Sequence, residues 1–170
     1  MTTILTSQQL DLTIKRLAHQ VLENHIDLKN TVFIGMQPRG IYVSDRIVDA
    51  IKKEKTGATV AYGKLDITFY RDDVRDQFHT ATKTEMPFNI DGKNVVLIDD
   101  VLYTGRTIRA ALDALLDFGR AAKVELCILV DRRFNRQLPI QPDYTGKAID
   151  TIISQRVKVL ADTHEVVMYE

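Results

Sequence analysis

The chain has 170 residues, which is the size of one ordinary folded domain. Hydrophobic residues make up 45% of it and charged residues 27%, a balance that is typical of globular proteins and excludes disordered, collagen-like and coiled-coil chains. The 23 basic and 23 acidic side chains cancel, so the chain has no global field to attract nucleic acid or a membrane, and any polyanion must be bound by a local cluster.

The N-terminal segment has no targeting pattern. Residues 1–9 lack the basic and apolar regions of a signal peptide, and no apolar stretch reaches the roughly 20 residues that span a bilayer. We therefore expect a cytoplasmic protein that does not cross a membrane. The single cysteine, Cys127, lies in the apolar run VELCILV, which favours a buried strand residue over a reactive thiol.

Helical and strand-like patterns alternate in the first half of the chain. Thr6 and Gln9 are spaced as a capping box, and apolar residues at helical intervals predict a helix up to about residue 25. TVFIGM (31–36) predicts a strand that the turn QPRG joins to a second helical run. Residues 59–70 predict another strand, and the polar residues 71–93 predict a long loop that could include an ordered hairpin.

The second half continues this alternation. NVVLIDD (94–100) predicts a buried strand, IRAALDALLDFG (108–119) a helix, and VELCILVD (124–131) a further strand. The tail from Gln137 holds the β-like pieces VKVL and EVVMY, which predict an edge or cap on the sheet. These patterns indicate an α/β fold class, with a mostly parallel sheet flanked by helices, in a single domain over residues 1–170. Ligands of such sheets bind at the carboxyl ends of the strands.

Two adjacent carboxylates stand at one of these strand ends. Asp99 and Asp100 end the apolar run NVVLIDD. Carboxylates in this position accept hydrogen bonds from the hydroxyls of a sugar, and they provide the hard oxygen ligands that suit Mg²⁺. We therefore treat both residues as candidate catalytic and metal-binding residues, with Mg²⁺ held directly or through the substrate.

An anion-binding loop follows directly. The next helix opens with Thr104, Gly105, Arg106 and Thr107. These residues provide unpaired backbone N–H groups, two hydroxyls, and a glycine that allows close approach of a ligand. A helix N-terminus favours a phosphate because of its free amides and its dipole.

The combination resembles the type I phosphoribosyltransferases. Their signature for 5-phosphoribosyl-1-pyrophosphate (PRPP) has four apolar residues, two acids and a threonine-glycine phosphate loop. The segments VVLIDDVLYTGRTIRAALDAL, LDITFYRDD, PRGIYV and LPIQPDYTGK are similar to the bifunctional pyrimidine operon attenuator and uracil phosphoribosyltransferase family, and the similarity extends over the whole chain. The resemblance implies the type I phosphoribosyltransferase fold, with a small hood built from the terminal segments. It also implies Mg²⁺-dependent transfer of ribose 5-phosphate from PRPP to uracil, giving UMP and pyrophosphate.

The resemblance also suggests roles for other segments. The turn that holds Arg39 and Gly40 follows a strand and opens a helix, so its amides and guanidinium are placed to bind pyrophosphate. Arg71 begins the polar loop that related enzymes close over PRPP, and we expect it to be a second pyrophosphate clamp. His79, in the same loop, has no evident partner in the sequence and is interpreted as a surface residue. Asp143 and Tyr144, in PDYTG, are weaker candidates for contacts with the nucleobase.

A second activity is implied by the same resemblance. Lys15, Arg16 and His19 form a small basic patch on the polar side of the first helix. The family binds the leader hairpin of its own pyrimidine messenger RNA through such residues and through a stretch usually written DRGHRELPIRADYIGK. In the stretch DRRFNRQLPIQPDYTGK, Arg136 and Lys147 match this pattern. Two RNA-binding side chains are replaced, one by Asn135 and one by Gln141.

Three functions remain open at this point: a uracil phosphoribosyltransferase, an RNA-binding sensor of uridine nucleotides with little catalysis, and a phosphoribosyltransferase for guanine, hypoxanthine or orotate. Main-chain groups can read the amide edge of a base, so residue types separate the last possibility only weakly. Because the chain carries no net charge, nothing electrostatic opposes self-association, and the family forms oligomers. We expect a homodimer or a higher homo-oligomer.

Overall fold

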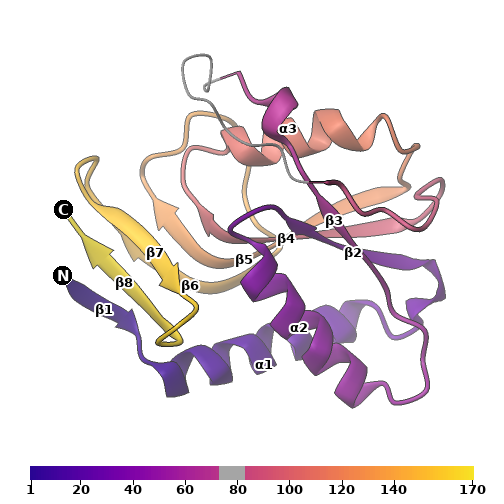
Figure 1. Ribbon diagram of the computed structural model, residues 1–170, viewed down its shortest axis with the longest axis horizontal. Helices are drawn as coiled ribbons and strands as arrows, with labels where there is room; N and C mark the ends of the chain where they lie inside the picture. The colour runs from indigo at the N-terminus through magenta and orange to yellow at the C-terminus, as the bar shows by residue number, and fades with distance from the viewer. Residues whose placement is uncertain (73–82) are drawn as a thin grey trace.

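The computed structural model describes residues 1–72 and 83–170. Within them, five parallel strands form a sheet in the order β3-β2-β4-β5-β6 (Figure 1). In chain order the strands are β2 (Thr31–Met36), β3 (Ala61–Leu65), β4 (Asn94–Leu102), β5 (Lys123–Arg133) and β6 (Tyr144–Asp150). The α/β class and the parallel sheet expected from the sequence are confirmed.

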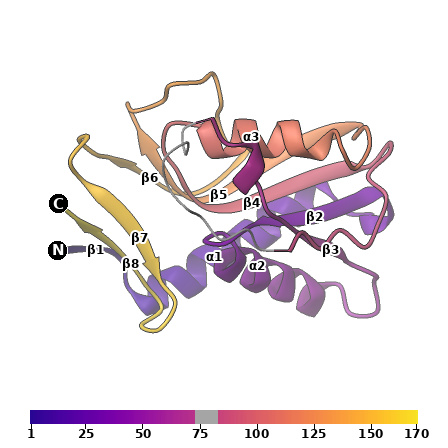
Figure 2. The ribbon, with the colours of Figure 1, turned by 45° about the horizontal axis from the view of Figure 1, so that its top comes forward.

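Helices cover both faces of this sheet. Helices α1 (Ser7–Asn24) and α2 (Ile41–Glu54) lie on one face, and α3 (Arg106–Leu115) lies on the other (Figure 2). Side chains alternate between the faces along a strand. On β4, for example, Val96 and Ile98 belong to the core under α1 and α2, whereas Val95 and Leu97 belong to the core under α3. Burial on both faces explains why the central strands are continuous apolar runs.

The start of α1 follows the sequence prediction. The Thr6 hydroxyl accepts a hydrogen bond from the Gln9 amide at 3.4 Å, and the Gln9 side-chain oxygen accepts one from the Thr6 amide at 3.0 Å. This reciprocal pair is a capping box. It satisfies two backbone N–H groups that otherwise lack partners at a helix N-terminus.

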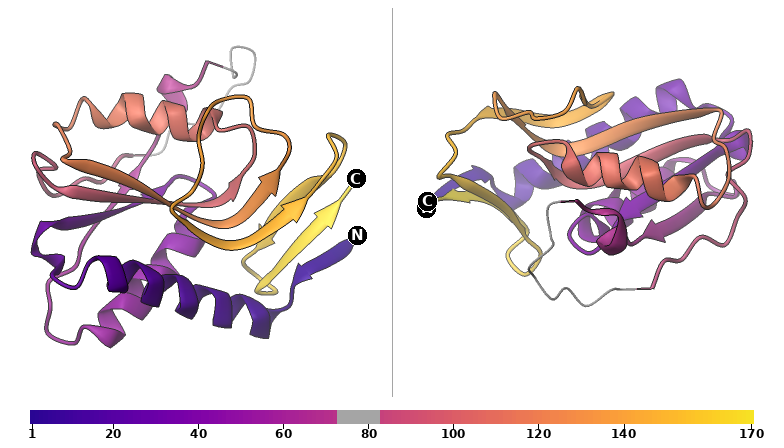
Figure 3. Two further views of the ribbon diagram at one scale, coloured as in Figure 1. Left: turned by 180° about the vertical axis from the view of Figure 1, so that it is seen from behind. Right: turned by 90° about the horizontal axis from the view of Figure 1, so that it is seen from above.

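A second sheet joins the two ends of the chain and forms the hood. Strand β8 (Glu165–Tyr169) lies between β1 (Thr2–Leu5) and β7 (Arg156–Leu160), and both pairings are antiparallel. The hood lies beside the parallel sheet, near the start of α1, and both termini are in it (Figure 3). The turn between β7 and β8 contacts α2, where His164 Nδ1 lies 2.6 Å from the Tyr42 hydroxyl.

Some predicted elements differ from the observed ones. The strand expected over residues 59–70 is β3 alone, followed by a 3-10 helix over Thr68–Tyr70. Strands β1 and β6 were not predicted, because β1 has only four residues and β6 contains a glycine and three charged or polar side chains without an apolar run. A short 3-10 helix, Leu28–Asn30, precedes β2.

Only part of the predicted long loop can be compared with the structure. Lys64 and Glu85 form an isolated antiparallel bridge, with both N–H···O distances at 2.8 Å, so residues near the end of this loop return to β3. His79 lies outside the described residues. Within residues 1–72 and 83–170, no helix combines the length and apolar character that a membrane span requires.

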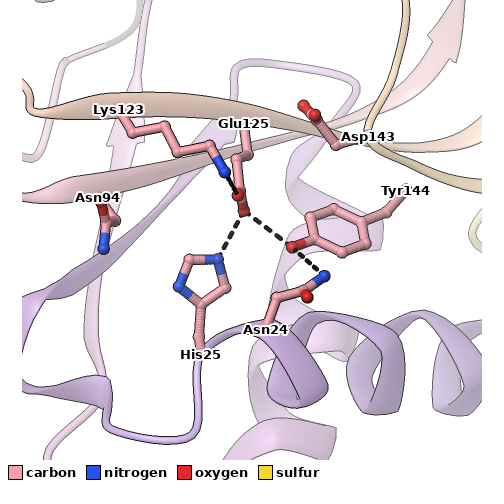
Figure 4. A pocket seen from close by; sticks show the side chains of 7 residues that line it. All are labelled: Asn24, His25, Asn94, Lys123, Glu125, Asp143 and Tyr144. Atoms are coloured by element: carbon pink, nitrogen blue, oxygen red, sulfur yellow. Dashed lines mark hydrogen bonds and ion pairs between the residues drawn. The ribbon is translucent and has the colours of Figure 1, made fainter.

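A buried carboxylate links α1, β5 and β6 at the amino ends of the strands (Figure 4). Glu125 Oε1 accepts a hydrogen bond from Lys123 Nζ at 2.5 Å. Its Oε2 lies 2.6 Å from His25 Nε2 and accepts a hydrogen bond from the Tyr144 hydroxyl at 2.8 Å. Asn24 Nδ2 donates to that hydroxyl at 3.1 Å. We call these five residues the Glu125 cluster; they line a cavity of about 340 Å³ together with Asn94 and Asp143.

The hydrogen bonds decide the charge of Glu125. Burial opposes ionisation, but the bonds from Lys123, His25 and Tyr144 outweigh it and lower the pKa of the Glu125 carboxyl. A carboxyl with a lowered pKa in the folded state adds stability above its unfolded pKa, and that stability is lost as the pH falls through the folded pKa.

We predict that Glu125→Gln lowers the free energy of unfolding at pH 7 by about 2 kcal/mol, the contribution typical of buried hydrogen bonds to a charged group. The loss relative to the wild type should shrink once the pH falls below the ordinary glutamate pKa, because the unfolded carboxyl then binds a proton that the folded state, with its lowered pKa, resists. Denaturant titrations at pH 7 and pH 3.5 measure both effects. Glu23→Gln, at an exposed position that lines a neighbouring cavity, is the control. An equal loss at both pH values would contradict the prediction.

Candidate functional site

Two buried carboxylates stand near the carboxyl end of β4. Asp99 and Asp100 are 5% and 7% exposed. Each carboxylate binds the next backbone amide: Asp100 N–H donates to Asp99 Oδ1 at 2.9 Å, and Val101 N–H donates to Asp100 Oδ1 at 2.8 Å. One oxygen of each carboxylate thus holds the local backbone.

The environment favours a proton on this pair. Burial raises the pKa of both carboxyls, and the charge of Asp100 raises the pKa of Asp99 further, to well above its ordinary range. The Arg39 guanidinium acts in the opposite direction on both residues. Two neighbouring buried carboxylates therefore form a site that gains from binding cationic or hydrogen-donating groups.

The loop after β2, Gln37–Gly40 (the QPRG loop), packs directly on these carboxylates. A Cβ atom on Gly40 would lie 2.7 Å from Asp99 Oδ1 and 2.7 Å from the Met36 carbonyl oxygen, so only glycine fits there. The peptide bond between Gln37 and Pro38 is cis. Arg39 is exposed at the start of α2. Its positive charge lowers the pKa of both carboxyls, so Arg39 lies close enough to act on Asp99 and Asp100.

The loop after β4, Thr104–Thr107 (the TGRT loop), opens α3. Gly105 is the N-cap residue with φ of +93°, and it has no side chain to cap the helix. The first-turn amides are thus free to meet a ligand, apart from Arg106 N–H, which donates weakly to Thr104 Oγ1 at 3.4 Å. Free first-turn amides at a helix N-terminus are the kind of arrangement that favours an anion.

The segment after β3 covers this loop. Arg71 Nη1 lies 3.4 Å from Thr107 Oγ1, and the Asp72 carboxylate forms ion pairs with Arg106 and Arg109 at 3.1 and 3.0 Å. Arg71 therefore lies at the TGRT loop in this structure. These ion pairs span more than 30 residues of sequence, and nothing local in the sequence indicates them.

Asp143 and Tyr144 do not lie at this site, which corrects the interpretation of these residues as nucleobase contacts. The Tyr144 side chain is 5% exposed and is directed into the Glu125 cluster. Asp143 Oδ2 accepts a hydrogen bond from the Leu126 amide at 2.8 Å. Figure 4 shows both residues with Asn94, the first residue of β4, whereas Asp99 and Asp100 lie near the other end of that strand.

The five residues proposed for RNA binding fall into two groups. Lys15, Arg16 and His19 are exposed on α1, and Arg16 donates to the backbone carbonyls of β6, where Lys147 is also exposed. Lys147 Nζ donates to the Ile4 carbonyl at 3.0 Å. His19 lies 3.4 Å from the Glu54 carboxylate. Arg136 is separate from this group: it donates to the Tyr103 carbonyl, next to the TGRT loop.

We predict that Asp99→Asn raises the melting temperature of the unliganded protein at pH 8. A raised pKa means that the ionised Asp99 costs stability at high pH and that this cost disappears as the pH falls toward the unfolded pKa. A gain of about 1 kcal/mol corresponds to roughly 2 to 4 °C for a chain of this size. Thermal scans from pH 4 to pH 8 measure it, and the gain should shrink toward pH 4. The exposed Asp113→Asn is the control; a loss of stability at pH 8 in Asp99→Asn would refute the argument.

Comparison with known proteins identifies the family. The protein-family model described as "phosphoribosyl transferase domain" matches residues 1–162 of the chain. The bifunctional protein PyrR of Picosynechococcus sp. is 49% identical over 158 residues, covering 92% of this chain and 88% of the relative. The bifunctional protein PyrR of Haemophilus ducreyi is 45% identical over 166 residues, covering 95% and 90%.

Solved structures support the same fold. The hypoxanthine phosphoribosyltransferase of Trypanosoma cruzi matches with a TM-score of 0.75 at 15% identity, covering 99% of this chain and 95% of that chain. A hypoxanthine phosphoribosyltransferase of Staphylococcus aureus matches with a TM-score of 0.70 at 20% identity, covering 90% and 80%. The chain therefore belongs to the phosphoribosyl transferase family, alongside the bifunctional PyrR proteins.

Proposed function

We propose that the protein catalyses the Mg²⁺-dependent transfer of ribose 5-phosphate from PRPP to uracil, which gives UMP and pyrophosphate. The observation that carries this proposal is that the QPRG loop packs on the buried carboxylate of Asp99, and that the TGRT loop follows Asp99 and Asp100 directly after β4 and opens α3. PRPP has an anion at each end of a sugar, and the two loops flank a carboxylate pair suited to the hydroxyls between them. The resemblance over the whole chain favours uracil as the acceptor.

Each part of the site has a role in this reaction. The TGRT amides and hydroxyls bind the 5-phosphate, and Asp99 with Asp100 accepts hydrogen bonds from the ribose hydroxyls. As the bond to pyrophosphate breaks, positive charge develops on the sugar and negative charge on the leaving oxygens. The carboxylates stabilise the first, and Arg39 with the Gly40 amide stabilises the second. No side-chain nucleophile is required.

The donor set suits magnesium. In the described ranges, 1–72 and 83–170, no group of three or more His, Cys, Asp or Glu side chains could hold a metal ion. Mg²⁺ commonly takes one or two carboxylates and completes its shell with substrate oxygens and water, so Asp99 and Asp100 fit it as partial ligands. When bound, the ion would neutralise charge on the pyrophosphate.

Arg71 is proposed to cover the bound PRPP on the side of the TGRT loop. Its segment already contacts the TGRT loop through Thr107 and through the ion pairs of Asp72. A cationic cover over PRPP would exclude the water that otherwise hydrolyses it. The cytoplasmic location and the homo-oligomeric state expected from the sequence remain predictions.

Asp100→Asn should reduce turnover by about 100-fold or more, because the neutral amide cannot stabilise a developing positive charge. Pyrophosphate release is measured with PRPP and Mg²⁺, using uracil, orotate, guanine and hypoxanthine in parallel and no base as the blank. Asp113→Asn, exposed on α3, should retain wild-type turnover. Release with a purine alone would reject uracil as the acceptor, and full activity in Asp100→Asn would reject the role of the carboxylate.

A second function, binding of a pyrimidine leader RNA hairpin, is favoured by the basic residues that share one surface of α1 and β6. Lys15, Arg16 and Lys147 are exposed there, and Arg16 links the helix to the strand through its bonds to the Thr145 and Gly146 carbonyls. Such a surface would contact phosphates and position the RNA. His19 is a weaker contributor because Glu54 lies beside it.

Lys15→Ala should weaken binding of the leader hairpin and make the slope of log affinity against log salt shallower by about one phosphate contact. Binding is measured with and without UMP, and a scrambled hairpin is the specificity control. Lys29→Ala, exposed on the 3-10 helix that follows α1, is the matched charge control. An equal effect of both variants would indicate only a general electrostatic attraction.

A further inference from the structure

The connection between β5 and β6 supports the TGRT loop from behind. In Figures 2 and 3 this connection lies beside the start of α3. Gln137 N–H donates to the Thr104 carbonyl at 2.9 Å, and Gln137 Oε1 accepts a hydrogen bond from Arg106 Nε at 2.8 Å. A Cβ atom on Gly105 would lie 3.4 Å from the Ile140 side chain. The backbone of the loop therefore rests on residues that are about 30 positions later in the chain.

Arg136 is the charged centre of this support. Its guanidinium donates to the Tyr103 carbonyl, one residue before the TGRT loop, and forms an ion pair with Asp131 at 2.5 Å. The two side chains are only 22% and 14% exposed. A hydrogen bond from a charged, partly buried donor is roughly twice as strong as a neutral one. Asp131, near the end of β5, thereby fixes the guanidinium to the sheet.

A second arginine, Arg132, contacts the side chain of Tyr103. The Arg132 guanidinium lies 3.8 Å from the centre of the Tyr103 ring. It also donates to Thr151 Oγ1 at 2.9 Å and to the Gln155 carbonyl at 2.7 Å. Tyr103 is therefore restrained through both its ring and its carbonyl, and neither restraint requires a ligand.

We propose that Arg136 is a positioning residue that sets the TGRT loop for the 5-phosphate of the sugar. It does not contact the substrate; it acts through the Tyr103 carbonyl, which determines where the following amides point. This inference rests on the proposed function, because it assigns the 5-phosphate to the TGRT loop. It differs from the role in RNA binding that the resemblance implies for Arg136, since the structure already commits the guanidinium to Asp131 and Tyr103.

The test separates the two ends of the substrate. PRPP, ribose 5-phosphate and inorganic pyrophosphate are titrated in the presence of Mg²⁺ against the wild type, Arg136→Gln and Arg136→Lys. Arg133→Gln is the matched control, because Arg133 ends β5 three residues before Arg136 and its ion pair with Asp150 is exposed to solvent. Melting temperatures are measured for every variant.

We expect Arg136→Gln to weaken ribose 5-phosphate and PRPP by about 10-fold or more, the loss associated with a charge-assisted hydrogen bond. Pyrophosphate affinity should be unchanged, because that anion belongs to the QPRG loop. Arg136→Lys should recover part of the loss, and Arg133→Gln should resemble the wild type. Adding Asp131→Asn to Arg136→Gln should cause little further loss, since both changes break one interaction.

Three outcomes would overturn the inference while leaving the proposed function intact. Wild-type affinity for ribose 5-phosphate in Arg136→Gln would show that the loop does not depend on this bond. A parallel loss of all three ligands with a lower melting temperature would show a general structural role. Unchanged binding of all three ligands with lost affinity for the leader hairpin would make Arg136 an RNA contact. Failure of the wild type to bind PRPP would overturn both the inference and the proposed function.

Discussion

The site depends on a close contact between a backbone and a carboxylate. At Gly40 the QPRG loop approaches Asp99 so closely that a methyl group would collide with both Asp99 Oδ1 and the Met36 carbonyl. This contact places the start of α2 against the end of β4. It brings Arg39 near the carboxylate pair without a hydrogen bond between side chains, and it leaves the guanidinium exposed to solvent. A substrate that carries both hydroxyls and phosphates can then bind between the Arg39 guanidinium and the carboxylates of Asp99 and Asp100.

The packing of the parallel sheet offsets the free-energy cost of burying these carboxylates. Two ionisable groups at 5% and 7% exposure cost free energy, and the apolar strands beside them hold the backbone in place against that cost. Strand β4 contributes to both cores, through Val96 and Ile98 on one face and Val95 and Leu97 on the other. The strand that carries the two buried carboxylates is therefore also a strand that contributes to both hydrophobic cores. Functional sites often combine costly polar groups with a stable scaffold.

Local patterns predicted the central part of the fold and the loops that follow its strands. The capping box of Thr6 and Gln9, the apolar strands and the loops that follow them depend on neighbouring residues, so the sequence displays them directly. Strand β1 was missed because its partner β8 lies at the other end of the chain, and β6 was missed because its burial is partial and it has no apolar run. A tertiary partner also explains the correction at Tyr144: the resemblance of PDYTG to a nucleobase-contacting segment suggests a ligand contact, whereas the Tyr144 hydroxyl donates to Glu125, 19 residues earlier. Tertiary partners of this kind leave no periodic signal.

The hood has a consequence for how the chain is made. Strand β1 pairs with β8, and Thr2 lies opposite Met168. A ribosome that synthesises the chain from its N-terminus produces β1 first and its partner only after nearly all the other elements, so this edge stays open while the parallel sheet assembles. An unpaired strand edge can join other chains, and pairings between distant segments form slowly. Synthesis speed and the availability of chaperones should therefore affect the yield of this protein more through its terminal strands than through its catalytic core.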